Sequence, residues 1–304
     1  SNQMEKINSR VYGVPALKSF ACLADKCQDN CCHSWDMPVD GTTAIIYREM
    51  CSELADSMTT NSNNQVTMRR DHDTGCCNKY EHGLCTIHAK YGSNLLSDSC
   101  HFYPSQLWQI GKDGHWQGGT LSCPAMAKLL LQQVNLLATE YKLDRMPHDV
   151  KTLEVGGIEF SKLVNLHFDL IGIISTSTEL SSQSLSQLHS IILSLMNFPE
   201  DNWPELISIY RQHPYSQFVG VDPSPDQELQ LLVLLVHLIK HYNYKVNERL
   251  TKIIKPIASL FEAEINWIEG TVSYKQCNLP EKALNFMSDS TLDVLLKRYI
   301  IASM

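Results

Sequence analysis

The sequence lacks the features that mark membrane proteins, nucleic-acid-binding proteins and secreted proteins. Its longest apolar run, Leu229–Ile239, is interrupted by Gln230 and His237 and is too short to cross a bilayer, so no membrane insertion is expected. The formal charge of −8 argues against nucleic acid as a partner, because nucleic acid selects basic surfaces. No positively charged, apolar leader opens the chain, so we expect a reducing, cytoplasmic setting.

Two short motifs are also missing. The glycine pairs Gly118-Gly119 and Gly156-Gly157 are isolated, and no G-x-G-x-x-G follows a strand pattern, which argues against a Rossmann-like methyltransferase core. There is no C-x-x-C motif and no thioredoxin-like alternation of strands and helices. A redox-active thiol protein is therefore the least favoured of the functional hypotheses.

Cysteine is what the sequence has in abundance, and it is unevenly distributed. Ten of the eleven cysteines lie in the first 123 residues, four of them within residues 22–32, and only Cys277 lies beyond. A disulfide framework fits poorly, because adjacent cysteines such as Cys31 and Cys32 rarely pair with each other and an odd number leaves one thiol over. The crowding instead favours a metal ion or an iron–sulfur cluster with thiolate ligands.

The rest of the composition indicates a globular protein with two regions. Hydrophobic residues make up 43% and charged residues 19% of the 304 residues, enough for a sizeable core. We expect a Cys-rich metal- or cluster-binding region over 1–150 and a helical domain over 151–304. The predicted fold class is mainly α: an irregular Cys-rich N-terminal region with a small β-hairpin, followed by an all-helical C-terminal region.

Hydrophobic spacing, capping residues and turn residues predict the individual elements. Gly111–Gly114 is a turn between two short apolar segments, which predicts a β-hairpin over 107–117. Pro124 suits the first turn of a helix that we expect to run to about Tyr141. The other helices are expected over 42–58, 84–96, 159–175, 179–197, 202–211, 226–248, 249–268 and 289–302.

With these spacings in view, the first half of the chain resembles the flagellin lysine-N-methylase family of bacteria. The resemblance covers about residues 18–130. Its residues, in chain order, are Phe20, Cys22, Cys27, Cys31, Cys32, Trp35, Asp40, Thr42, Thr43, Tyr47, Gly75-Cys76, Leu84-Cys85, Gly92, Leu95, Ser97, Cys100, Phe102-Tyr103-Pro104 and Leu121-Ser122-Cys123-Pro124. Eight cysteines in this order form a specific pattern.

The resemblance implies an enzyme that transfers methyl groups from S-adenosylmethionine to lysine ε-amines of flagellin or a similar protein. It also implies a 4Fe-4S cluster, with zinc as the alternative metal. The implied metal ligands are drawn from Cys22, Cys27, Cys31, Cys32, Cys76, Cys85, Cys100 and Cys123. Eight thiols exceed the needs of one cluster, so either four ligate or two centres exist. Cys51, Cys77 and Cys277 fall outside the pattern and are expected to be small buried hydrophobes.

Three residues inside the pattern are candidates for the methyl-transfer chemistry. Trp35 and Tyr103 are aromatic, which suits contact with a sulfonium cofactor, and Tyr103 is also a candidate catalytic residue. Asp40 is a candidate general base for the lysine ammonium, with the capping of the following helix as its structural alternative.

Two positions depart from the family pattern. Ser105 stands where the family commonly has Arg, and Ala125 where it commonly has Glu. An Arg binds carboxylates through two hydrogen bonds and a Glu accepts protons, so both changes bear on catalysis. The alternative function is therefore a non-catalytic zinc- or iron-binding module with a helical interaction domain.

Overall fold

The computed structural model describes most of the chain, and its residues form two compact units. The described residues are 10–27, 29–33, 35–112, 114–132, 137–176, 181–214, 225–241, 248–260 and 262–274. The first unit takes in residues 1–176 and 197–208, and the second takes in 177–196 and 209–297. The expected helix over 289–302 and Cys277 lie outside the described residues.

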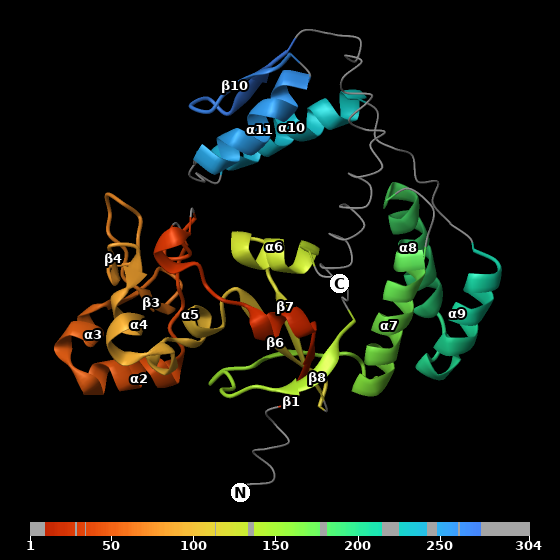
Figure 1. Ribbon diagram of the computed structural model, residues 1–304, viewed down its shortest axis with the longest axis horizontal. Helices are drawn as coiled ribbons and strands as arrows, with labels where there is room; N and C mark the ends of the chain where they lie inside the picture. The colour runs from red at the N-terminus through yellow and green to blue at the C-terminus, as the bar shows by residue number, and fades with distance from the viewer. Residues whose placement is uncertain are drawn as a thin grey trace, which may run out of the picture. The chain divides into compact units, whose positions relative to one another are not determined.

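A five-stranded mixed sheet forms the centre of the first unit (Figure 1). Its strand order is β8-β1-β7-β6-β9, and the strands are β1 (Arg10–Gly13), β6 (Ser105–Ile110), β7 (Gly114–Gly119), β8 (Thr139–Lys142) and β9 (Lys151–Leu153). The β1–β7 and β6–β9 pairs are parallel, whereas β1–β8 and β6–β7 are antiparallel. The sheet is therefore unlike the parallel, doubly wound sheet of Rossmann proteins.

Different helices cover the two faces of this sheet, as the alternation of side chains along β7 requires. Trp116 contacts His167 of α7 (Phe160–Thr176), with ring centroids 4.6 Å apart. The neighbouring Gln117 points to the other face, where it accepts a hydrogen bond from the Tyr141 hydroxyl. On that face α6 (Pro124–Gln132) buries Met126 completely, close to Gly119.

The remaining residues of the first unit form short helices and ribbons around a separate apolar core. The helices are α2 (Gly41–Met50), α3 (Ser52–Asp56), α4 (Thr86–Tyr91) and α5 (Asp98–Phe102). The ribbons pair β2 (Met58–Thr60) with β3 (Val66–Met68), and β4 (Tyr80–Glu81) with β5 (Leu84–Cys85). Tyr47 of α2 is 1% exposed in this core, and its hydroxyl donates to the Leu95 carbonyl oxygen at 2.9 Å.

The second unit contains helices and one small β-ribbon. Its helices are α8 (Ser181–Leu195), α10 (Pro225–His241) and α11 (Glu248–Leu260), while α9 (Trp203–Gln212) spans the division between the units. The strands β10 (Glu264–Asn266) and β11 (Thr271–Ser273) pair in antiparallel fashion. Ile265, Trp267 and Val272 of this ribbon pack against the buried residues of α10 and α11.

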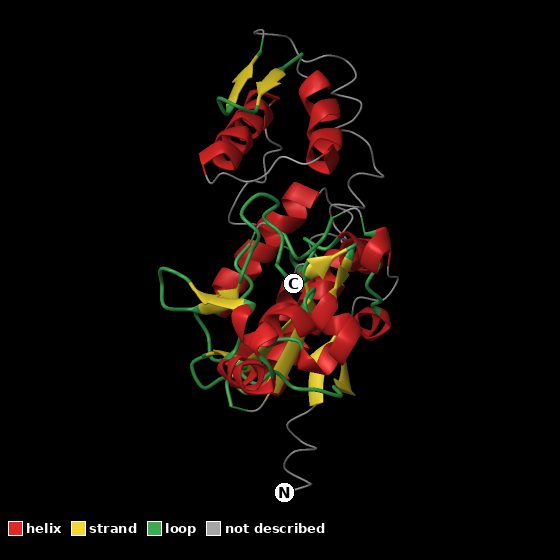
Figure 2. Cartoon of the chain, turned by 90° about the vertical axis from the view of Figure 1, so that its left-hand side faces the viewer, coloured by secondary structure: helices red, strands yellow, loops and turns green. Residues whose placement is uncertain are grey.

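The predicted fold class is wrong, because the structure is mixed α/β. The first unit has the five-stranded sheet in place of an irregular region with one hairpin, and the C-terminal region contains the β10–β11 ribbon (Figure 2). The helix expected to reach about Tyr141 ends at Gln132, and Thr139–Lys142 is strand β8. The helix expected over 249–268 ends at Leu260, before β10.

Other predicted elements are confirmed. The hairpin is β6–β7, with its turn at Gly111, whose φ is positive. Helices α7 to α10 occupy the segments expected for them. The helices expected over 42–58 and 84–96 are confirmed in part: Cys51 separates α2 from α3 and Gly92 follows α4, while Met58 begins strand β2 and Leu84–Cys85 is strand β5.

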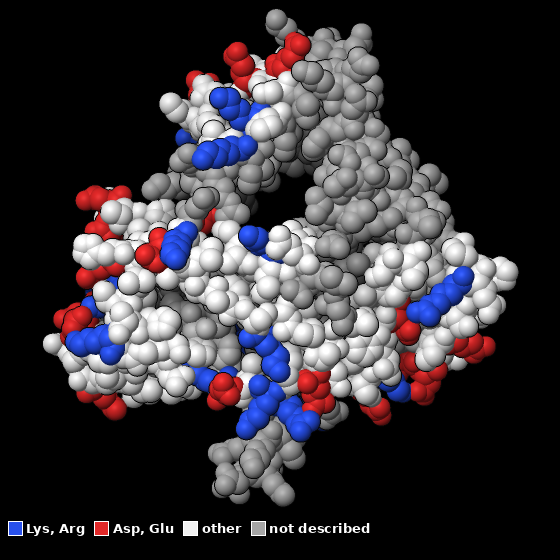
Figure 3. Space-filling model, viewed as in Figure 1, with Lys and Arg blue, Asp and Glu red and all other residues white. Residues whose placement is uncertain are grey.

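Two surface properties complete the description. No helix among the described residues is both long enough and apolar enough to cross a membrane. On the face drawn in Figure 3, the described Lys and Arg side chains are interspersed with Asp and Glu side chains.

Candidate functional site

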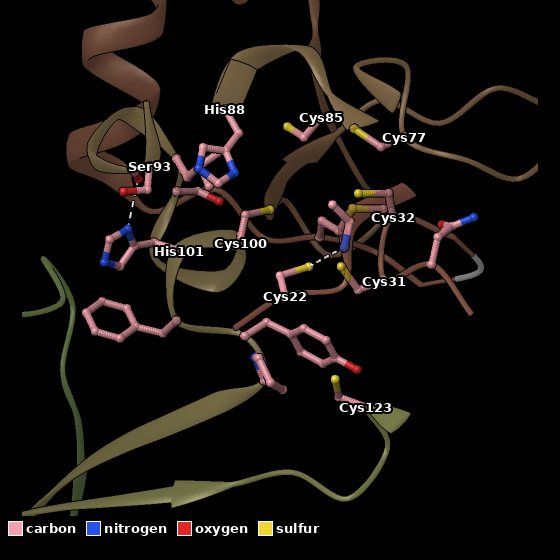
Figure 4. A pocket seen from close by; sticks show the side chains of 18 of the residues that line it. Cys22, Cys31, Cys32, Cys77, Cys85, His88, Ser93, Cys100, His101 and Cys123 are labelled. Atoms are coloured by element: carbon pink, nitrogen blue, oxygen red, sulfur yellow. Dashed lines mark hydrogen bonds between the residues drawn. The ribbon is translucent and has the colours of Figure 1, made fainter. Parts of the chain in front are cut away.

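The cysteines of the first unit converge on one cavity of about 760 Å³. Eight of them line it: Cys22, Cys27, Cys31, Cys32, Cys77, Cys85, Cys100 and Cys123. None of the ten cysteines among the described residues forms a disulfide. Segments far apart in the sequence thus bring eight thiols to a single space (Figure 4).

Seven of the eight cysteines of the sequence pattern line this cavity, and Cys76 is the exception. Its place is taken by Cys77, which lay outside the pattern. Cys77 is 6% exposed, which confirms the expected burial, and it also faces the cavity. The sequence gives no signal that separates two adjacent cysteines. Cys51 packs against the apolar core of the short helices and does not line the cavity.

Local structure fixes the direction of these side chains. Cys85 ends β5, and Cys100 lies in the middle of α5. Cys77 is held by its backbone N–H, which donates to the Cys32 carbonyl oxygen at 2.7 Å. Cys123 immediately precedes α6 and is buried among Ala16, Met126 and neighbouring apolar side chains.

The chemistry of the donor set suits a soft metal centre. Hydrogen bonding between the Cys31 and Cys32 thiols lowers the pKa of Cys31 to about 7 and, together with burial, raises that of Cys32. Burial raises the pKa of Cys100 to about 12. Thiols with raised pKa, such as Cys32 and Cys100, would release protons on ligating a metal, which is the usual coupling of metal binding to pH.

The spacing of the sulfur atoms is wider than a single metal ion requires. Among the described residues, only Asp40, Asp98 and His148 bring three potential ligand atoms within 4.8 Å of one another, so no three described thiols do. The sulfur ligands of a tetrahedral zinc ion, with bonds of about 2.3 Å, lie about 3.8 Å apart. In this arrangement no three of the described thiols lie close enough together to ligate one zinc ion.

Two aromatic residues form a wall of the cavity. The rings of Trp35 and Tyr103 are 6.3 Å apart between centroids, and both line the cavity. The Trp35 Nε1–H donates to the Cys31 carbonyl oxygen at 2.6 Å, and the Tyr103 hydroxyl is 3.3 Å from Ser122 Oγ. Burial raises the pKa of Tyr103, so this hydroxyl stays protonated at neutral pH.

The same two rings also border a second cavity, of about 750 Å³. Three carboxylates and one ammonium group line it, namely those of Asp40, Asp98, Asp149 and Lys151. Trp35 and Tyr103 therefore line both the thiol-lined cavity and a second cavity whose charged side chains are mostly acidic.

Asp40 has the capping role that the sequence offers as its structural alternative. Its carboxylate accepts from the Thr43 N–H at the start of α2 and from the Asp98 N–H, both at 2.9 Å, and it lies 2.9 Å from His148 Nδ1. Burial acts to raise its pKa, but the hydrogen bonds from Asp98 and Thr43 outweigh burial and hold the pKa below its ordinary value. Its predicted role as a general base stays a prediction.

The sequence analysis did not identify Arg145 and His148 as partners of this network. The Arg145 guanidinium lies 3.0 Å from the Asp98 carboxylate, with both side chains largely buried, and His148 bridges Asp40 and Asp98. The segment after β8 is thereby tied to α2 and α5. No spacing rule in the sequence predicts such contacts between distant segments.

The two family departures both lie at the thiol-lined cavity. Ser105, at the start of β6, and Ala125, in the first turn of α6, are among its lining residues. His88 and His101 line the cavity too, and His101 Nδ1 lies 2.8 Å from the Ser93 carbonyl oxygen (Figure 4).

Comparison with known proteins gives one relevant match. The chain is 22% identical over 142 residues to the flagellar biosynthetic protein FliU of Salmonella muenchen, an alignment that covers 43% of this chain and 82% of that protein. No family model matches the chain. No solved structure matches it either.

Proposed function

We propose that this protein is a lysine N-methyltransferase that acts on flagellin or a similar bacterial protein, with S-adenosylmethionine as donor and a thiolate-bound 4Fe-4S cluster. The observation that carries the proposal is the convergence of eight thiols on one cavity whose wall is the Trp35–Tyr103 pair. The similarity to a flagellar biosynthetic protein supports flagellin as the class of substrate. Reduced thiols of this kind fit a cytoplasmic enzyme.

The donor set supports a cluster in preference to zinc. Four thiolates are the usual ligands of a 4Fe-4S cluster, and the cluster holds them farther apart than one ion does. The absence of any three described thiols within 4.8 Å of one another agrees with the larger group.

The protein's own residues bind and orient the donor in this proposal. A cavity of about 760 Å³ lies within the size range of cofactor sites, roughly 300–1,000 Å³. The rings of Trp35 and Tyr103 offer π faces to a sulfonium cation, which is attracted to the ring quadrupole. Once the lysine amine is neutral, methyl transfer depends mainly on in-line placement of the two reactants.

The second cavity gives the lysine side chain a route to the same wall. Its three carboxylates and one ammonium group favour binding of a cationic side chain. A lysine ammonium has a pKa of about 10.4 in water and must lose a proton before it attacks the methyl group. Asp40 lines this cavity as the predicted base, and its hydrogen bonds make it a weak one. The neighbouring carboxylates also favour the charged lysine, so loss of the proton requires that desolvation beside the Trp35–Tyr103 wall outweigh them.

The test is co-expression with flagellin under oxygen-free conditions. Intact-mass measurement of the flagellin should show added methylene units, and digestion should place them on lysines. The matched pair is Tyr103→Ala against Tyr103→Phe: the Phe variant keeps the ring face and retains methylation, whereas the Ala variant loses most of it. Cluster-loaded protein that neither binds S-adenosylmethionine nor modifies any protein would refute the enzyme assignment.

One observation favours the alternative of a non-catalytic metal-binding module with a helical interaction domain. Both family departures, Ser105 and Ala125, line the thiol cavity. If the natural chain is inactive, the double variant Ser105→Arg, Ala125→Glu should gain donor binding or methyl transfer. Activity of the unmodified chain, with no gain in the double variant, would exclude this alternative.

A further inference from the structure

We infer that the cluster is held by one set of four thiols, those of Cys32, Cys77, Cys85 and Cys100, and that Cys77 rather than its neighbour Cys76 completes the set. The inference rests on the proposed function for the presence of a cluster. It goes beyond that function by dividing the eight cavity thiols and by replacing one member of the sequence pattern.

The first argument is that these four thiols share one core. Cys77 is among the buried residues of the apolar core beneath the short helices, and the other three pack against that core. Cys51 packs there as well but does not line the cavity. Four cysteines therefore satisfy both conditions among the described residues.

The second argument is that the other four cavity thiols are not among the residues of that core or packed against it. Cys22 and Cys31 are exposed, and Cys123 belongs to a different apolar cluster, beside α6. Cys27 interacts electrostatically with Cys22 and Cys123. Figure 4 shows Cys123 apart from Cys85, Cys77 and Cys100, on the side of the cavity toward the sheet.

The third argument concerns the adjacent pair Cys76 and Cys77. Both have extended backbone, since Cys76 forms a bridge with His33 and Cys77 forms one with Arg70. Successive side chains of an extended segment point to opposite sides, so only one of the two can face the cavity. The structure assigns this position to Cys77, whose Sγ points toward the space beside Cys85 in Figure 4.

The four ligands then come from four separate segments. Cys32 is the last of the four cysteines within residues 22–32, Cys77 precedes β4, Cys85 ends β5 and Cys100 lies in α5. Four thiolates are the full complement of one 4Fe-4S cluster. Cys31 is adjacent to Cys32 in the chain but is not one of the four inferred ligands. Cys22, Cys27 and Cys123 are the other cavity thiols outside the set.

The experiment compares Cys77→Ser with Cys76→Ser in the full chain, purified without oxygen. Iron and acid-labile sulfide should be about four each per chain in the unmodified protein, as one 4Fe-4S cluster requires. Cys76→Ser should keep that content and its visible spectrum, whereas Cys77→Ser should lose most of both. Cys32→Ser, Cys85→Ser and Cys100→Ser should behave like Cys77→Ser, and Cys22→Ser like Cys76→Ser.

Because Cys77 is buried, loss of iron in the Ser variant has to be separated from misfolding. Cys77→Asp supplies an oxygen ligand at the same place, so it should retain iron with a changed visible and electron paramagnetic resonance spectrum. A purely structural role for Cys77 would leave the spectrum of any retained cluster unaltered.

The outcomes separate this inference from the proposed function. Iron that survives Cys77→Ser and is lost in Cys76→Ser overturns the inference and leaves the cluster enzyme standing. Loss of iron in Cys22→Ser or Cys123→Ser, with iron kept in Cys100→Ser, overturns it in the same way. Unmodified protein without iron and sulfide removes the cluster from the proposed function itself, and this assignment with it.

Discussion

At the scale of single residues, Asp40 shows how a candidate catalytic group also holds the structure together. Its carboxylate caps α2 through Thr43 and accepts a second backbone hydrogen bond from Asp98. A cap of this kind stabilises a protein by about 1 kcal/mol, and leaving the buried donors unsatisfied adds to the cost of removing it.

We expect Asp40→Ala to lower the free energy of unfolding by about 2–3 kcal/mol, since it removes the cap and leaves the Thr43 and Asp98 N–H groups without that acceptor. Asp40→Asn keeps an oxygen for the Thr43 N–H, so it should cost about half as much. Urea denaturation measures both, with the exposed Asp73→Ala as the neutral control. Methyl transfer abolished in Asp40→Asn at nearly unchanged stability would instead indicate the predicted general base.

A second residue-scale prediction concerns His167, which packs against Trp116. Burial lowers its pKa to about 4, and no hydrogen-bond partner for its Nε2 lies among the described residues. The unfolded-state pKa is about 6.5, so the stabilising effect is complete above that value and is lost as the pH falls toward 4.

The free energy of unfolding should therefore fall by about 1 kcal/mol between pH 7 and pH 5 through this group, a value reduced for its partial exposure. His167→Leu should remove that part of the pH dependence, which denaturation at several pH values will show. His72→Gln, at a fully exposed position, should leave the pH dependence of the free energy of unfolding unchanged. The prediction would be contradicted if the free energy of unfolding varied with pH equally in the unmodified protein and in His167→Leu.

At the scale of elements, the sequence predicts amphipathic helices well and short strands poorly. Helix α7 and the β6–β7 hairpin carry enough periodic residues or turn residues to be recognised locally. Strand β8 lies in a segment that also fits a helix, and it is a strand because Arg10–Gly13 lies alongside as a partner. That partner is distant in sequence, so local patterns miss it.

The two glycines of β7 give a test of how α7 packs on the sheet. A Cβ on Gly114 would lie 2.0 Å from the Phe160 ring, whereas a Cβ on Gly118 would meet nothing within 4 Å. Gly114→Ala should lower the free energy of unfolding by about 1–3 kcal/mol, the usual cost of overpacking. Gly118→Ala is the matched control and should be close to neutral.

The expected rescue makes this test specific to the α7 contact. Phe160→Ala in the Gly114→Ala background should recover part of the loss, because the two positions are in direct contact and their effects are not additive. Thermal denaturation of the four proteins gives the coupling energy. Additive effects would mean that Phe160 does not pack over Gly114.

At the scale of the whole molecule, much of the site could be predicted and little of its surroundings. The cysteine pattern identifies seven of the eight thiols that line the cavity, and a predicted metal site is the kind of site that restricts residue type and spacing. The choice between Cys76 and Cys77 depends on which side of an extended segment faces inward, and the sequence does not carry that information. The second cavity also depends on tertiary contacts alone.

Binding of the methyl donor should be visible in the stability of the entire chain. A ligand that binds only the folded state at about 100 times its dissociation constant adds about 2.7 kcal/mol. We expect S-adenosylmethionine to raise the melting temperature of cluster-loaded protein, with the shift retained in Trp35→Phe and reduced in Trp35→Ala. An identical melting temperature with and without the donor would count against the cavity as its site.

The four thiols assigned to the cluster are spread along the chain, which has a consequence for the folding and degradation of the protein. Cys32, Cys77, Cys85 and Cys100 belong to segments that meet only in the folded first unit. A group bound to all four cross-links residues 32–100 as several disulfides would, and it shortens the loops available to the unfolded chain. In the proposed cluster-bound protein, loss of the cluster should therefore loosen residues 32–100 and expose them to proteolysis.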